Sequence, residues 1–460
     1  MTSSISSDPA GIPAGTARSR PAGDPAGAPA FGARTRVALI SPYGGGNLGD
    51  ATIMESAIHA LRRRRPGAGI ANIVGLTLNP RVVQERHGIP GFPCAGFRLP
   101  SYGSLDESAP RPDDTGPLAR MVTAVTPLRK ARTLGRTVRS ELGHRQRARD
   151  FLSGFDAVVV AGGGQLDELW GGPFGHPYAL WKWGQLAHEV RARYLILSVG
   201  VGKLHSRLSR LFTRRALALA DACSFRDPGS LEMAAFADVS RAQVVPDLAY
   251  AAPLQRPVEA PLAGRRPVLA ISPLAYGDPR VWPEKDAAHY QHHLESMAAL
   301  CRRMLALGWE IVFVSSDSPD AATARDVLAV MEPLLLPEER ARVTTPDTRT
   351  LAGLVQALAP ADVVVAARLH GVIISHLLGK PVLALSYERK VTALMNGMEQ
   401  QSLMLPIRNL DSEVATAKVL GILERRETWA ADVRARVAAY RQQVEDQYDR
   451  LFGAVDSASS

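Results

Sequence analysis

From Arg36 onward, apolar runs of strand length alternate with longer stretches of helical composition, and this alternation narrows the folds open to the chain. It is typical of βα units around parallel sheets, because a crossover helix must separate successive parallel strands. Strands are expected at 35–41, 70–76, 156–161, 194–199, 222–225 and 243–245, and then, after a restart at Pro267, near 310–315, 342–344, 362–367 and 381–386. Helices are expected at 50–64, 178–191, 206–220, 228–236, 286–307, 319–332, 348–358 and 371–378. The predicted class is α/β with parallel sheets.

The length of the chain predicts more than one domain. With 460 residues it exceeds what a single hydrophobic core usually holds. The Pro-rich segment 252–267 is the natural linker, and residues 1–34 contain too little apolar material to order. The predicted division is a disordered tail at 1–34, an N-terminal Rossmann-like domain at 35–255 with an insertion or basic segment at 90–149, a C-terminal Rossmann-like domain at 256–425, and a C-terminal helix at 426–460 that packs back and ends in a short tail.

The charge and the cysteine content of the chain narrow its expected binding partners and its cellular location. Lys and Arg total 54 against 45 Asp and Glu, which favours anionic partners without choosing among them. Cys94, Cys223 and Cys301 are far apart and lack C-x-x-C spacing, so neither a disulfide framework nor a zinc site is expected. No segment is apolar over the roughly 18 residues of a spanning helix, and 1–34 lacks the core of a signal peptide. A cytoplasmic location is expected.

The segment 129–149 is rich in arginine with intermittent Leu and Val. Two interpretations stay open, because amphipathic basic helices serve both purposes. One is a solvated basic helix. The other is a helix on an anionic membrane surface, which would place the protein peripherally at the inner face of the membrane.

A glycine-dense turn, Ser41 to Asp50, follows the first apolar run and leads into a helix. Glycines there let backbone N–H groups approach a ligand at the carboxyl end of the strand, although a purely structural turn fits as well. The spacing matches neither GxGxxG nor the P-loop. Similar glycines end two later strands, and such turns share one sheet edge in a doubly wound fold. The substrate-binding candidates are Gly44, Gly45, Gly46, Asn47, Asp50, Gly163, Gly164, Gly200 and Gly202.

A mixture of acids and indoles follows the second glycine turn. Its members are Asp167, Glu168, Trp170, Trp181 and Trp183. Carboxylates and indoles can hydrogen-bond to and stack on a sugar, but both are also ordinary residues of helix faces and cores.

The most informative stretch of the second half is Arg368-Leu-His370, between an apolar strand and a helix N-terminus. The free N–H groups there favour anions, and arginine offers a two-nitrogen fork for carboxylate or phosphate. The same positive end disfavours imidazolium and leaves His370 able to accept a proton from a hydroxyl. A structural role for this histidine is the alternative. Downstream, Tyr387 and Lys390 end another strand near the same edge, where the lysine is either a second phosphate-binding cation or solvated.

In the order and spacing of its motifs, the chain resembles the polysaccharide pyruvyl transferase family over about residues 36–400. The matching motifs are Tyr43-Gly-Gly-Gly-Asn47-Leu-Gly-Asp50, Ala161-Gly-Gly-Gly164, Ser198-Val-Gly-Val-Gly202, Ser224-Phe-Arg226-Asp227-Pro-Gly-Ser230, Pro246-Asp247, and Arg368-Leu-His370 through Tyr387 and Lys390. The resemblance implies two Rossmann-like domains facing a cleft, as in GT-B glycosyltransferases. It also implies phosphoenolpyruvate as donor and a saccharide, free or lipid-linked, as acceptor. Neither a metal, a cofactor nor nucleic acid is expected.

The resemblance further implies that Arg226, Arg368 and His370 serve the donor and catalysis. An Arg-Asp pair after a strand is also often a local salt bridge, so Arg226 keeps that alternative, and Asp247 ranks lower because it can simply cap or brace the linker. The implied reaction places a pyruvate ketal on a sugar of a surface-polysaccharide precursor, with His370 transferring a proton as acid or base. Two other functions stay open: a GT-B nucleotide-sugar glycosyltransferase, and a catalytically silent membrane-associated scaffold.

Overall fold

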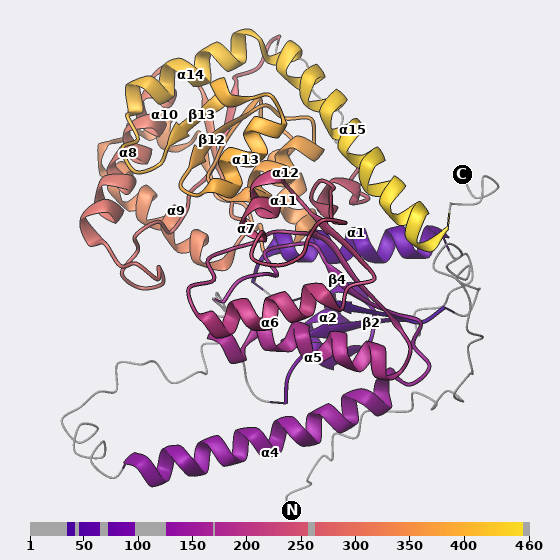
Figure 1. Cartoon of the computed structure of the whole chain (residues 1–460). Helices are drawn as coiled ribbons and strands as arrows, with labels where there is room; N and C mark the ends of the chain where they lie inside the picture. Colours follow the sequence, from indigo (N-terminus) through magenta and orange to yellow (C-terminus); the bar gives the residue numbers. More distant parts are fainter. Residues whose placement is uncertain are drawn as a thin grey trace, which may run out of the picture.

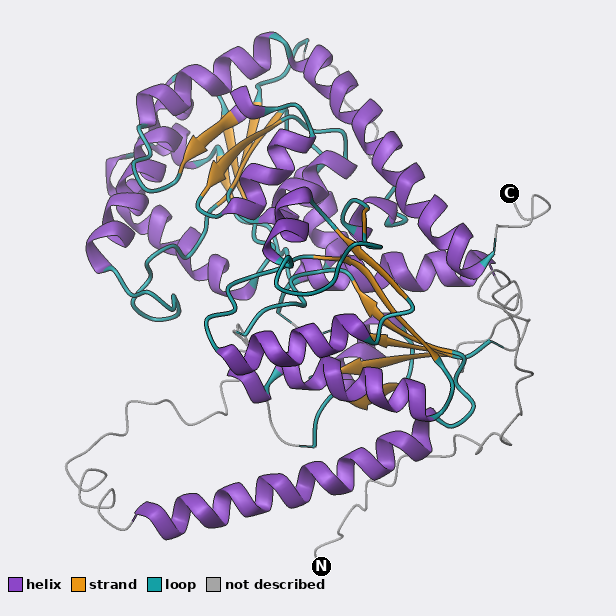
Figure 2. Ribbon diagram, in the orientation of Figure 1, coloured by secondary structure: helices purple, strands orange, loops and turns teal. Residues whose placement is uncertain are grey.

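The computed structural model describes residues 35–41, 46–64, 72–96, 126–168, 171–255 and 263–453, with only the backbone described at 126–137. Two α/β domains are stacked one on the other, with the sheet of each enclosed by helices (Figures 1 and 2). The predicted fold class, two Rossmann-like domains with parallel sheets, is confirmed.

The N-terminal sheet has seven parallel strands in the order β3-β2-β1-β4-β5-β6-β7. Its strands are β1 (Val37–Ile40), β2 (Ile73–Thr77), β3 (Gly91–Pro93), β4 (Ala157–Ala161), β5 (Arg193–Val199), β6 (Ala222–Phe225) and β7 (Gln243–Val244). The strand order reverses between β1 and β4, and ligands of doubly wound folds bind at such a switch point.

The C-terminal sheet repeats this topology with six parallel strands in the order β10-β9-β8-β11-β12-β13. Its strands are β8 (Val268–Ser272), β9 (Glu310–Phe313), β10 (Val343–Thr344), β11 (Val363–Ala366), β12 (Val382–Ser386) and β13 (Met404–Pro406). The reversal here falls between β8 and β11, so each domain has its own switch point.

Helices cover both faces of each sheet (Figure 2). The N-terminal domain contributes α1 (Leu48–Arg64), α2 (Pro80–His87), α4 (Thr126–Leu152), η3 (Gly172–Phe174), α5 (His176–Glu189), α6 (Arg207–Ala218), α7 (Pro228–Met233) and η4 (Leu248–Ala251). The C-terminal domain contributes α8 (Ala287–Ala306), α9 (Ser318–Met331), η5 (Glu332–Leu334), α10 (Pro337–Arg340), α11 (Leu351–Leu358), α12 (Leu369–Leu377), α13 (Arg389–Gly397), η6 (Gln401–Leu403), α14 (Ser412–Glu424) and α15 (Arg426–Phe452).

The hydrophobic core is continuous across the two domains. Val37 and Leu39 of β1 belong to a buried cluster that extends into the C-terminal sheet, whereas Ala38 and Ile40 point to the opposite face, toward α5. This alternation is the period of a strand buried on both faces. The shared cluster fixes the relative position of the two domains, and therefore of the residues at their switch points.

Helix α15 leaves the C-terminal domain and runs back along α1 (Figure 1). The side chain of Arg64, at the end of α1, is fully buried and pairs with Glu445 at 2.7 Å and Asp449 at 2.6 Å. A buried guanidinium requires such partners, since an unpaired charge in the interior is costly. The last helix therefore braces the first one from outside the N-terminal sheet.

Helix α4 lies on the side of the N-terminal domain away from the C-terminal domain (Figure 1). Its second half is anchored by Glu141, which accepts a hydrogen bond from the buried Nζ of Lys182 at 2.6 Å. Val138 and Leu142 are 50% and 64% exposed. No helix in the described ranges is both long and apolar enough to cross a bilayer. Contact of α4 with a membrane surface stays a prediction.

Several helices and strands were not predicted from the sequence. The segment 90–149 is poor in strand signal, yet β3 pairs with β2 at the sheet edge, where proline and short strands are tolerated because no further ladder is needed. Helix α2 is short and mostly polar, with the single buried residue Val83. Helix α13 and strand β13 follow β12 at the other end of the chain. Short, polar or edge elements carry too weak a periodicity to be read from sequence.

Candidate active site

The start of α1 is the point where the two domains meet. The backbone of Asn47 forms an isolated antiparallel bridge with Asp317, and Leu48 N donates to Ser316 O at 2.9 Å. The side-chain oxygen of Asn47 accepts from Gly49 N at 2.8 Å, so it caps α1. The start of α1 is therefore held against the loop that follows β9, and the switch points of both domains face each other here.

His370 lies in the first turn of α12, directly against the backbone of α1. A Cβ added at Gly49 would lie 2.0 Å from His370 Nδ1, so the imidazole occupies the space that any other side chain at position 49 would need. Its Nε2 lies 3.7 Å from Asp247 Oδ2 and is buried without a hydrogen-bond partner among the described residues. The helix begins at Leu369, two residues before the predicted start, so the ring is presented by the helix rather than by the preceding turn.

Asp247 connects this histidine to the N-terminal domain. It follows β7, caps η4 by accepting from Ala249 N at 3.0 Å, and receives Arg226 Nη1 on Oδ2 at 3.4 Å. Burial alone would raise the pKa of Asp247, but its contacts with His370, Arg226 and the Ala249 N–H outweigh burial and hold the pKa below its ordinary value. A buried carboxylate is thus shared between an imidazole of one domain and a guanidinium of the other.

The guanidinium of Arg226 lies over Gly200. A Cβ there would be 2.6 Å from its Cζ, which explains why a glycine ends the loop after β5. Arg226 also lies 3.6 Å from Asp227, but Asp227 mainly caps α7 through Ser230 N at 2.7 Å. The local Arg–Asp pair and the contact with Asp247 therefore coexist.

Arg368 is already paired inside its own domain. Its Nε and Nη2 donate to the two carboxylate oxygens of Asp320 at 2.8 and 3.0 Å, and Asp317 lies 3.2 Å from Nη2. Burial lowers the pKa of Arg368, but the two carboxylates raise it well above its usual value. The fork that the sequence led us to expect open toward an anion is held by Asp320, and the side chain is 15% exposed.

Two further carboxyls lie at this interface, one from each domain. Burial raises the pKa of Asp50. The charge of His370 opposes this shift, and the charge of Asp247 adds to it. Burial also raises the pKa of Asp317, to about 6. Arg368 opposes this shift, and Asp320 and Asp50 add to it. Raised carboxyl pKa values of this kind are a signature of functional sites.

Lys390 and Tyr387 border the same region from the C-terminal domain. Lys390 Nζ pairs with Glu388 at 2.8 Å and lies 5.5 Å from the centroid of the Tyr387 ring. Burial lowers the pKa of Lys390, but Tyr387 and Glu388 more than offset this and raise it. The Tyr387 ring also meets Trp282 at 5.7 Å and Tyr276 at 6.2 Å between centroids.

The glycine candidates divide by position. Gly44 and Gly45 lie outside the described residues, and Gly46 is half-buried at the start of the described loop. Gly163 has φ 71° and faces Asp50, whose Oδ1 lies 3.6 Å from a Cβ added there. Gly202 lies against the Asp167 carboxylate, which a Cβ would overlap. Gly164 has nothing within 4 Å of an added Cβ. Gly163 and Gly200 therefore line the cluster, whereas Gly202 belongs to a neighbouring contact.

The acids and indoles after the second turn are mostly structural. Trp183 is fully buried and donates to Cys94 O at 2.9 Å, and Trp181 stacks on Phe212 at 5.2 Å. Glu168 accepts from the backbone N–H groups of His205 and Ser206. Trp170 lies outside the described residues. Of the two interpretations, packing holds for Trp181 and Trp183.

Sequence reasoning passed over several residues of this site. Gly49, Asp317 and Asp320 were not selected, and Asp247 was ranked low. The sequence could have indicated Asp317, because this residue follows the end of an apolar strand at Phe313-Val-Ser-Ser, at the ligand-binding edge of the sheet. Among the described residues, no group of three or more His, Cys, Asp or Glu side chains is arranged to hold a metal ion.

Replacing Gly49 by alanine is expected to displace the His370 ring. The added Cβ overlaps the imidazole, and a misplacement of about 1 Å at a catalytic group can cost about 10²-fold in rate. We expect kcat to fall by about that factor and the melting temperature to fall as well, because His370 Cβ lies only 2.5 Å from the added atom and overpacking costs about 1–3 kcal/mol. Gly421→Ala on α14, where an added Cβ meets nothing, is the matched control and should keep full activity. Full activity in both variants would contradict the placement of His370.

The fold and this interface define a protein of the GT-B type, with two Rossmann-like domains facing each other. Within that class, the family model "Polysaccharide pyruvyl transferase" matches residues 47–389, and the chain belongs to this family. A search of curated proteins gave no match.

Solved structures of low sequence identity share the fold. HepE of Anabaena, in complex with UDP, is 11% identical with a TM-score of 0.50, over 91% of this chain and 98% of that one. A glycosyltransferase of Rickettsia africae is 9% identical with a TM-score of 0.52, over 91% and 98%. The UDP-GlcNAc 2-epimerase of Neisseria meningitidis, bound to UDP-GlcNAc, is 10% identical with a TM-score of 0.52, over 91% and 99%. At these identities the likeness concerns the fold alone.

Proposed function

We propose that the protein transfers the pyruvyl group of phosphoenolpyruvate to a saccharide of a surface-polysaccharide precursor and forms a pyruvate ketal there. The observation that carries this proposal is the junction at Asp247, where His370 of one domain and Arg226 of the other meet at one carboxylate oxygen. Family membership supports the reaction class.

The donor carries a phosphate and a carboxylate, so it needs cations converging from more than one side. Arg226 supplies one from the N-terminal domain, and Lys390 supplies another from the C-terminal domain. The charges of both residues lower the pKa of Asp50, which supports a donor site between them. Arg368 contributes further positive charge to this region, although its guanidinium donates to the Asp320 carboxylate. We assign donor binding to Arg226 and Lys390. Arg368 instead holds the first turn of α12 in place.

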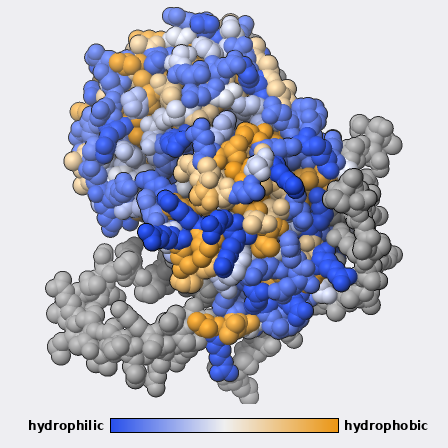
Figure 3. Space-filling view, viewed as in Figure 1, coloured by the Kyte–Doolittle hydropathy of each residue, from blue (hydrophilic) through white to orange (hydrophobic). Residues whose placement is uncertain are grey.

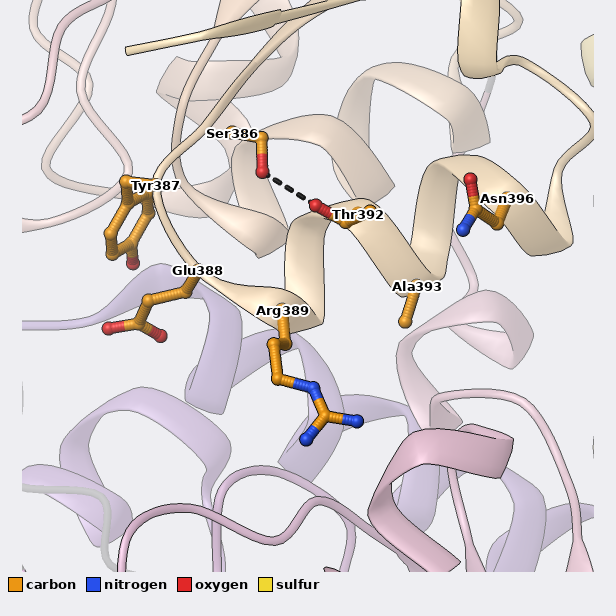
Figure 4. A pocket seen from close by; sticks show the side chains of 7 residues that line it. All are labelled: Ser386, Tyr387, Glu388, Arg389, Thr392, Ala393 and Asn396. Carbon is orange, nitrogen blue, oxygen red and sulfur yellow. Dashed lines mark hydrogen bonds between the residues drawn. The ribbon is translucent and has the colours of Figure 1, made fainter. Parts of the chain in front are cut away.

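The acceptor has a candidate pocket next to this volume. A hollow of about 430 Å³ follows β12 and the first turns of α13, a size within the range of small-molecule sites. Figure 4 shows Tyr387 and Glu388 at one end and Asn396 at the other, with Ser386 and Thr392 joined by a 2.7 Å hydrogen bond. Hydroxyl, amide and charged groups beside an aromatic ring suit a sugar.

The surface around the pocket is mixed in character. Figure 3 shows hydrophilic surface over most of the C-terminal domain and an apolar area near the middle of the view, where the domains meet. Arg389 reaches Glu232 of α7 at 3.8 Å across that boundary. We place the acceptor along α13, with the hydroxyls that react directed toward His370, whether the glycan is free or lipid-linked.

The donor is tested against the nucleotide-sugar alternative by ligand-induced stabilisation. Phosphoenolpyruvate is expected to raise the melting temperature of the protein, since a ligand at 100 times its Kd stabilises the native state by about 2.7 kcal/mol. UDP at equal concentration should leave it unchanged. A shift with UDP and none with phosphoenolpyruvate would favour a glycosyltransferase. A shift with neither, together with binding to anionic vesicles, would favour the scaffold.

A further inference from the structure

Asp50 is the one member of the charged cluster whose carboxyl oxygens make no hydrogen bond or ion pair with any part of the chain that the structure describes. Asp247, Asp317 and Asp320 all have such partners. The backbone N–H of Asp50 is capped by Asn47, so its position at the start of α1 is fixed while its side chain is left without a partner.

The groups around Asp50 come from every element at the interface. Arg226 follows β6, Asp247 precedes η4, His370 belongs to α12, Lys390 belongs to α13, and Asp317 caps α9. All interact with Asp50 electrostatically, yet none makes an ion pair with it. Gly163 lies beside the Asp50 carboxyl on the side of β4, where an added Cβ would be in ordinary contact with Oδ1 at 3.6 Å. The carboxyl therefore borders the same small volume as the cations without touching them.

This arrangement has a consequence for the protonation of Asp50. Burial already raises its pKa, and a bound trianion in the adjoining volume raises it further, because like charges disfavour ionisation. The positive N-terminus of α1 opposes this effect. A donor held by Arg226 and Lys390 thus favours the protonated form of Asp50. The ketal reaction needs such an acid, since the methylene carbon of phosphoenolpyruvate must gain a proton.

We propose that Asp50 is the general acid that protonates the methylene carbon of the donor, and that it recovers its proton from the second acceptor hydroxyl. This inference rests on the proposed function. In this scheme two groups transfer protons. Asp50 protonates the methylene carbon. His370, whose Nε2 lies near Asp247, takes the proton of the first hydroxyl and gives it to phosphate.

The steps balance as follows. The C2–C3 π electrons take the proton of the Asp50 carboxyl, which gives a methyl group, a cationic C2 and an Asp50 carboxylate. The first hydroxyl oxygen bonds to C2 and passes its proton to His370. The C2–O bond to phosphate then breaks, and phosphate leaves with the electron pair and the proton from His370. The second hydroxyl attacks C2 and returns its proton to Asp50. One proton ends on the methyl group, one ends on phosphate, and both residues are restored.

Asp50→Asn is the first test, because asparagine keeps the shape of the side chain but has no acidic proton. We expect ketal formation to fall by about 10²- to 10⁴-fold. Wild type in D2O should place one deuterium in the ketal methyl group. Asp432→Asn, the same substitution at an exposed position of α15, is the control and should keep wild-type rate and melting temperature.

Donor binding gives a readout that needs no turnover. In wild type, the Kd of phosphoenolpyruvate should rise as pH rises through the Asp50 pKa, because the carboxyl ionises and repels the donor. In Asp50→Asn this rise should be absent. The ratio of the two Kd values should change by about tenfold for each unit by which the donor raises the Asp50 pKa. Titrations of the donor itself cancel in this ratio.

The outcomes separate this inference from the function on which it rests. If wild type neither binds nor consumes phosphoenolpyruvate, the proposed function fails and the inference fails with it. If wild type reacts and Asp50→Asn reacts equally fast, the inference alone is overturned. If Asp50→Asn loses donor affinity equally at every pH, Asp50 is a binding group and not the acid.

Discussion

Replacing His370 by glutamine is expected to lower kcat for ketal formation by about 10²- to 10⁴-fold while the affinity for phosphoenolpyruvate changes little. The imidazole Nε2 lies 3.7 Å from Asp247 and the ring rests on the backbone at Gly49, so the structure fixes its orientation from two sides. Glutamine keeps a polar side chain of similar length but cannot carry the hydroxyl proton. The measurement is phosphate release under saturating donor.

A matched control separates catalysis from stability. His289→Gln removes an imidazole from α8, where the ring pairs with Asp286 instead of with Asp247. It should keep wild-type kcat. If His370→Gln keeps its melting temperature and its rate, the proton transfer must be assigned to another residue.

The second large effect is expected at Arg226. Arg226→Gln removes the cation that pairs with Asp247 and that we assign to the donor, and truncating one partner of a buried charge pair costs about 2–5 kcal/mol. Because 1.4 kcal/mol is tenfold in affinity, the Kd of phosphoenolpyruvate should rise by about 30-fold to more than 10³-fold. Arg226→Lys should lie between, since lysine keeps the charge and loses the two-nitrogen fork. Calorimetric titration of the donor measures both.

The exposed Arg214 on α6 provides the control for overall charge. Arg214→Gln removes the same charge from the surface and should leave the donor Kd unchanged. An equal loss of affinity in both variants would mean that net charge, and not the contact with Asp247, governs donor binding.

The fold was predictable because it depends on long periodic signals. Strands β1, β4 and β11 are apolar throughout and buried on both faces, and β5 is mostly apolar after Arg193. The helices between them are long enough to show a pattern. Strand β3 was missed because it has three residues, two of which are Gly and Pro. Local sequence says little about such an edge strand, since the rest of the sheet decides whether it pairs.

The site was predictable only in part. Glycines and charged groups at strand ends mark the ligand edge, which is how Asp50 and His370 were selected, whereas Arg226 was selected from the family resemblance. Their partners are set by tertiary contacts over long separations, such as Arg368 with Asp320 and His370 with Asp247. A motif shows that an arginine is present but not which way its fork points. The pairing of Arg368 inside its own domain therefore had to come from the structure.

The most direct measurement of the central claim is phosphate release from phosphoenolpyruvate in the presence of a panel of candidate glycans. Wild type is expected to release phosphate with at least one acceptor at least about 10²-fold faster than His370→Gln, and that product should contain an acid-labile ketal. Equal rates for the two proteins across the whole panel, with no ketal formed, would contradict the account.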